Sequence, residues 1–136
     1  MKRLHLAVGV GGVIAFLLTG QYMDRALDHM AGVPDLPRML YRSAHIYLLL
    51  GSLLNLALGV YLSEASAGWR RVVGRIGSVA ILLAPPLFVL AFMSEPQRSD
   101  FQRPFAGPAI YACAVGAVLH ALSAVRRGTR DGVPQL

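Results

Sequence analysis

The sequence contains a single cysteine, Cys113, among 136 residues. One thiol cannot form an intramolecular disulfide, and the pair of cysteines found in many structural zinc sites is missing. The sequence also has no glycine-rich phosphate loop and no nucleophile–base pair. These absences argue against hydrolysis and group transfer as the function.

Charged residues are missing from four long apolar stretches, Leu4–Met23, Ala44–Leu62, Ile76–Met93 and Phe105–Val125. Each has about 18 to 21 residues, the length of a helix that crosses a hydrocarbon core of about 30 Å. The mean hydropathy of +0.54 and the hydrophobic share of 55% are far above those of an ordinary soluble domain. The sequence therefore predicts an all-α integral membrane protein, a single domain with four transmembrane helices.

The first stretch follows Lys2 and Arg3, as the apolar part of a secretory signal peptide would. It is longer than that part usually is, and no convincing cleavage site follows before Gln21, so we expect a retained transmembrane helix. The predicted connections are short, and the outer ones, 24–43 and 94–104, contain proline. Tight connections favour antiparallel neighbours, which predicts an up-down-up-down bundle.

The net charge of +6 is unevenly distributed over this topology. One side has only Glu64 and Asp131 as acids, whereas on the other side acids and bases balance. The positive-inside rule therefore places both termini in the cytoplasm of a bacterial-type inner (plasma) membrane, in a multi-pass arrangement. We expect anionic lipid as the partner of these basic residues, and no nucleic acid. The basic residues on the cytoplasmic side are Lys2, Arg3, Arg70, Arg71, Arg75, Arg126, Arg127 and Arg130.

Two features of the spans bear on packing. Small residues such as Ala7, Gly11 and Ala15 recur every fourth position, which lets helix backbones approach closely in lipid and predicts a homo-oligomer. Pro85 and Pro86 should bend the third span, and we expect packing against neighbouring helices to accommodate the bend.

The four histidines form two pairs, one near each membrane face. His5 and His120 lie near the inner ends of the first and fourth spans, whereas His45 begins the second span and His29 lies in the preceding loop. Haem iron takes neutral imidazole as an axial ligand, and a porphyrin fits an apolar slot between helices. The layout therefore predicts haem b held by histidines, with His45 and His120 as the main ligands and His29 and His5 as their respective partners. A single haem per chain, or ligands shared between subunits, stays open.

Residues around the histidines suit this hypothesis. Gly9 and Gly116 lie one helical turn deeper than His5 and His120, where a glycine would let the macrocycle approach the backbone. Arginines would pair with the haem propionates, and tyrosines would add ring contacts or hydrogen bonds on the outer side. These residues are Arg42, Arg126, Arg127, Tyr41 and Tyr47.

The four-span plan and the placement of the histidines resemble the small four-helix membrane b-type cytochromes, which hold two haems near opposite faces. The resemblance covers the layout and no specific motif. It implies electron transfer with a quinone, an oxygen species or another redox partner, in a protein that would be a haem-dependent oxidoreductase.

Three other functions compete with haem binding. A small transporter would need a carboxylate within the membrane, and no predicted span contains one. A non-catalytic scaffold or assembly factor would use Ser52 and Asn55 to join helices. An outer-face divalent-metal site would draw on four residues, Asp24, Asp28, His29 and His45.

Overall fold

The computed structural model describes residues 1–62, 68–98 and 100–124. Over these ranges the chain is helical, without strands, and four helices are long and apolar enough to span a membrane. These are α1 (Lys2–Gln21), α2 (Asp35–Tyr61), α3 (Trp69–Ser94) and α4 (Ala106–Ala124). Three short segments follow α1 and α3, namely η1 (Tyr22–Ala26), η2 (Asp28–Met30) and η3 (Glu95–Gln97). The predicted all-α class with four span-length helices is confirmed.

Two helices begin well before the apolar stretches that predicted them. Helix α2 starts at Asp35 instead of Ala44, and α3 starts at Trp69 instead of Ile76. Charged residues can continue a helix beyond its apolar part, so a search for uncharged stretches misses these turns. Pro37 is tolerated near the start of α2 because N–H groups in a first helical turn have no partner within the helix.

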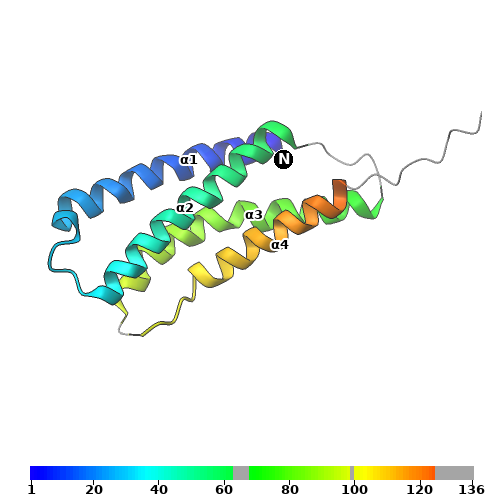
Figure 1. Ribbon diagram of the computed structural model, residues 1–136. Helices are drawn as coiled ribbons and strands as arrows, with labels where there is room; N and C mark the ends of the chain where they lie inside the picture. Colours follow the sequence, from blue (N-terminus) through cyan, green and yellow to red (C-terminus); the bar gives the residue numbers. More distant parts are fainter. Residues whose placement is uncertain (63–67, 99, 125–136) are drawn as a thin grey trace, which may run out of the picture.

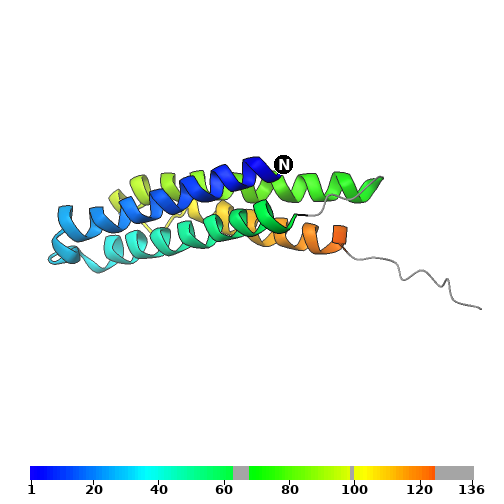
Figure 2. The ribbon, with the colours of Figure 1, turned by 90° about the horizontal axis from the view of Figure 1, so that it is seen from above.

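Successive helices run in opposite directions, as Figure 1 shows. Helix α1 packs along α2, α3 packs along α4, and the two hairpins meet mainly through α2 and α3. In Figure 1, α1 and α4 lie on opposite sides of the α2–α3 pair, and the view from above in Figure 2 shows all four helices running lengthwise together. We call the end that holds the start of α1 the N-terminal end. The end that holds the α1–α2 and α3–α4 connections is the connection end.

Glycines let the helices approach each other closely in both hairpins. A Cβ added to Gly9 of α1 would lie 2.8 Å from the backbone nitrogen of Leu56 on α2. In the second hairpin, a Cβ on Gly77 or Gly116 would lie 2.9 or 2.8 Å from the carbonyl oxygen of the other glycine. These positions allow close approach of the backbones, which is a main source of helix association in lipid.

Helix α3 continues through Pro85 and Pro86. In a regular helix the N–H of residue 85 would donate to the carbonyl of Ile81, but proline has no N–H. Asn55 of α2 supplies a donor instead, because its Nδ2 lies 2.9 Å from the carbonyl oxygen of Ile81. Proline is tolerated within a membrane helix where a neighbour satisfies the freed carbonyl in this way.

A buried carboxylate holds the connection end together. Glu95 has no exposed surface, and its Oε1 accepts hydrogen bonds from the backbone N–H groups of Phe105 and Ala106 at 3.1 and 2.8 Å. Its Oε2 accepts a hydrogen bond of 3.2 Å from Nε of Arg103, and Nη2 of Arg103 donates to Oγ of Ser43 at 2.8 Å. Glu95 therefore caps the start of α4 and links it to α2 and α3.

Replacing Gly9 by alanine should destabilise the bundle, because the new methyl group overlaps the backbone of Leu56. Overpacking of this kind costs about 1–3 kcal/mol. Gly11→Ala is the matched control, since no described atom lies within 4 Å of its added Cβ. Thermal unfolding of both variants in one detergent, followed by circular dichroism, measures the difference. Equal midpoints for the two variants would contradict the packing described here.

Replacing Glu95 by glutamine should lower the free energy of unfolding by about 1–3 kcal/mol, because Arg103 and the start of α4 lose a charged acceptor. The control is Asp100→Asn, which removes a half-exposed carboxylate 3.7 Å from Arg98. Exposed pairs of this type contribute little. Unfolding by denaturant in mixed micelles gives both values, and a Glu95→Gln protein as stable as the control would exclude the capping role.

Candidate functional site

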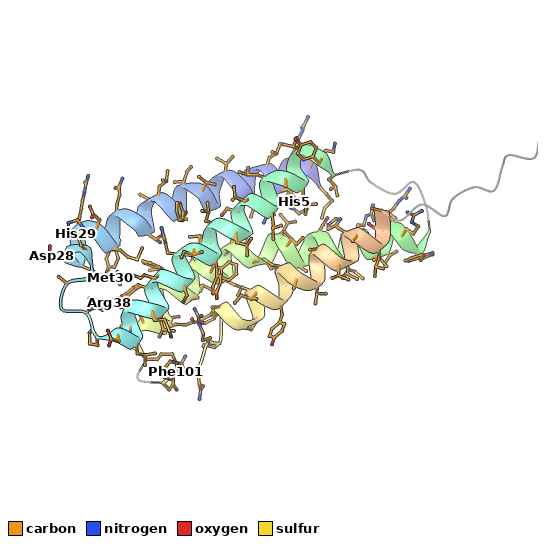
Figure 3. The ribbon with its side chains drawn as sticks, viewed as in Figure 1. His5, Asp28, His29, Met30, Arg38 and Phe101 are labelled. Atoms are coloured by element: carbon orange, nitrogen blue, oxygen red, sulfur yellow. The ribbon has the colours of Figure 1, made fainter. Side chains whose placement is uncertain are left out.

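The N-terminal end of the bundle contains a polar cluster to which all four long helices contribute. Its members are His5 of α1, Asn55 of α2, Ser78 of α3 and His120 of α4. His5, Asn55 and Ser78 are buried, with at most 1% of their surface exposed. Figure 3 labels His5 toward this end, far from His29 at the connection end. A buried cluster of this polarity needs internal partners, because neither water nor lipid can supply them there.

His5 has one partnered and one unpartnered ring nitrogen. Its Nδ1 lies 2.8 Å from Oδ1 of Asn55. Its Nε2 is buried and has no hydrogen-bond partner among the described residues. Buried polar atoms of this kind are rare, and each calls for an explanation.

His120 is the second imidazole at this end. Its Nε2 lies 3.2 Å from Oγ of Ser78, a contact near the long limit of a hydrogen bond. The structure thus brings these two sequence-predicted residues to one end of the bundle, from helices that lie on opposite sides of it.

The glycines expected to make room for a macrocycle instead pack against neighbouring helices. A Cβ on Gly9 would meet Leu56, and one on Gly116 would lie 2.5 Å from Cγ1 of Ile81. The faces of these two glycines are therefore filled by protein. A porphyrin beside His5 or His120 would have to lie against other surfaces.

At the connection end, His45 contacts helix α1. Its Nδ1 lies 2.9 Å from Oγ1 of Thr19, and its ring stacks on Phe16 with centroids 4.0 Å apart. The Thr19 hydroxyl donates to the Phe16 carbonyl at 2.9 Å. Because that hydroxyl hydrogen is engaged, Oγ1 acts as the acceptor and His45 carries its proton on Nδ1.

His29 does not join His45. Its Nδ1 lies 2.5 Å from Oδ1 of Asp24, and both side chains are more than half exposed. Asp28, His29 and Met30 all have positive φ, which turns the chain between η1 and α2. Among the described residues no group of three or more His, Cys, Asp or Glu side chains comes together. Of the four residues expected to form an outer metal site, the structure thus brings only Asp24 and His29 into contact.

The remaining predicted site residues lie in other surroundings. Arg42 is exposed on α2. The ring of Tyr41 packs edge-on against Phe92 at 5.0 Å, and the ring of Tyr47 lies 5.8 Å from Phe88. These two tyrosines thus belong to the aromatic packing of the connection end. Arg126 and Arg127 lie outside the described residues.

A cavity of about 370 Å³ lies in the connection half of the bundle. Its walls are mainly apolar, and hydroxyl and amide groups add a few polar contacts. Thr19 connects this cavity to His45, because its hydroxyl contacts the imidazole. The lining residues are Ala15, Leu18, Thr19, Tyr22, Tyr41, Val89, Phe92, Met93 and Gln97.

Sequence reasoning missed the partners of two histidines. Thr19 and Ser78 are the polar side chains within α1 and α3 that meet His45 and His120. A polar residue in an otherwise apolar span is a signal for such a contact, but the sequence does not give its partner. The partner depends on the rotation and register of two helices that are distant in the sequence.

The fold and the polar cluster define an all-helical protein with four helices able to span a membrane. No family model matches the chain, and no curated protein or solved structure shows a significant match.

Proposed function

We propose that this chain is a membrane b-type haem protein that binds iron through His5, with His120 as the second ligand. The observation that carries the proposal is the buried Nε2 of His5, which has no partner within the described part of the chain. An unprotonated imidazole nitrogen in an apolar site is a good iron ligand. The sequence alone predicted His45 and His120 as the main ligands, whereas this proposal has His5 as the main ligand.

The donor groups near His5 fit haem ligation better than ligation of a bare divalent ion. Two imidazoles are available at this end, and no group of three ligand side chains occurs among the described residues. Zinc sites normally use three or four protein ligands, whereas haem iron needs only one or two axial ones. Because the faces of Gly9 and Gly116 are filled by Leu56 and Ile81, a macrocycle would have to rest against other surfaces near His5.

Bound haem supplies one-electron redox chemistry. The protein would contribute the ligand nitrogen of His5, its orientation by Asn55, and the apolar surroundings that exclude water. A redox partner such as a quinone would fit the cavity of the connection half, where an apolar body and polar groups can both be accommodated. The protein would then act as a haem-dependent oxidoreductase or an electron carrier.

A bacterial-type inner membrane with the N-terminal end in the cytoplasm is the location that we propose. Lys2, Arg3 and the basic start of α3 gather at that end, which agrees with the positive-inside rule. Helices α1 and α4 expose large apolar side chains along their lengths, for example Leu17 and Val118. Lipid and further copies of the chain are the partners that suit these faces.

A non-catalytic oligomeric scaffold is the second candidate. It is favoured because the other three histidines have protein partners, Thr19, Asp24 and Ser78. In that function the polar cluster would serve only to hold the helices in register.

The visible spectrum of the detergent-purified protein, before and after dithionite, separates the two candidates. We expect a Soret band that sharpens on reduction, with α and β bands. His5→Ala should abolish it and His120→Ala should weaken or shift it. His29→Ala is the control that should leave it unchanged, because His29 is exposed at the other end.

A colourless protein, even after expression with a haem precursor, would contradict haem binding and favour the scaffold. A haem spectrum that survives His5→Ala but is lost in His45→Ala would contradict the assignment of the site to the N-terminal end.

A further inference from the structure

The side chain of Asn55 is held in one orientation by its hydrogen bonds. Its Nδ2 donates to the carbonyls of Gly51 and Ile81, at 2.8 and 2.9 Å. A carbonyl oxygen can only accept, so the amide nitrogen has to face both of these groups. The amide oxygen Oδ1 is thereby directed to the remaining side, where His5 lies.

The orientation of Asn55 determines which nitrogen of His5 carries the proton. Because Oδ1 can only accept, the 2.8 Å contact requires a proton on Nδ1 of His5. A neutral imidazole has one N–H, so Nε2 then holds a lone pair. That lone pair is buried and has no donor among the described residues.

We propose that Asn55 is a positioning residue that selects the tautomer of His5, with the proton on Nδ1 and the Nε2 lone pair available to a metal. The identity of that metal as haem iron rests on the function proposed above. Metal-ligating histidines commonly donate their second N–H to a fixed acceptor, which sets the tautomer and the ring orientation.

The acceptor at His5 is an uncharged amide and not a carboxylate. This difference affects the relative stability of ferric and ferrous iron bound to His5. A carboxylate would draw the proton from Nδ1 and give the ligand anionic character, favouring ferric over ferrous iron. An amide leaves the imidazole neutral. Asn55 therefore favours the reduced iron, relative to the same site with aspartate.

The first test uses the haem-free, full-length protein, labelled with [15N]histidine in lipid bilayers. The His5 signals are assigned by their loss in His5→Ala. We expect nitrogen chemical shifts of a protonated Nδ1 and an unprotonated Nε2 in the native protein. Asn55→Leu should abolish this preference. The control Ser52→Ala should preserve it, because Ser52 is also buried on α2 but donates only within its own helix, to Leu48.

The second test follows haem in the same variants after reconstitution with hemin. Asn55→Leu should bind haem about 10–100-fold more weakly. Asn55→Asp should retain haem and lower its midpoint potential. Ser52→Ala should change neither value, and size-exclusion profiles identify any variant that does not fold.

The two tests separate the inference from the proposed function. A proton on Nε2 of His5 in the native protein, or the same tautomer in Asn55→Leu, would overturn the positioning role whether or not haem binds. The expected tautomer in a protein that takes up no hemin would support the control of His5 by Asn55 and overturn the function as a haem protein. An unchanged or raised potential in Asn55→Asp would overturn the proposed effect on the iron.

Discussion

The carbonyl of Ile81 is the constraint on which the arrangement of the N-terminal end depends. Pro85 removes the N–H that would have satisfied this carbonyl, and an unpaired carbonyl buried in apolar surroundings costs several kcal/mol. Asn55 of α2 satisfies it at 2.9 Å, which fixes the register of α2 against α3. The same amide then directs its oxygen to His5 and so ties α1 to the pair. The N–H that α3 lacks at Pro85 is thereby linked, through Asn55, to which ring nitrogen of His5 carries the proton.

The connection end is held by a different kind of interaction. There the buried carboxylate of Glu95 accepts hydrogen bonds from the first residues of α4 and from Arg103. At the connection end a charged acceptor is useful, because the start of α4 has several unpaired N–H groups. Between the two ends, glycines such as Gly9 and Gly116 allow the helices to approach closely.

Much of the fold could be predicted from the sequence, because four stretches without charge have the length of a membrane span. The start of α2 could not, since Arg38 and Arg42 lie in its first turns and carry charge that a search for apolar stretches rejects. Glu95 was predicted to lie in the polar connection 94–104, because its charge also ends an apolar stretch. Nothing in its local sequence indicates that its carboxylate is buried against α4.

The histidines could be sorted by the end of the bundle from the sequence, but not by environment. His45 was expected to be a main ligand, and in the structure its Nδ1 contacts Thr19. His5 was expected to be only a partner to His120, and it is the fully buried one with a free nitrogen. That difference arises from Asn55, which is fifty residues away in the sequence and meets His5 only through helix packing. The sequence alone does not specify that register.

A double-mutant cycle of Asn55→Leu and Pro85→Ala tests the central claim most directly. The free energy of unfolding is measured for the native protein, both single variants and the double variant. If Asn55 replaces the N–H that Pro85 lacks, Asn55→Leu should cost less in the Pro85→Ala background, by at least about 0.5 kcal/mol. In that background the backbone N–H of residue 85 satisfies Ile81 by itself. An equal cost of Asn55→Leu in both backgrounds would contradict the account.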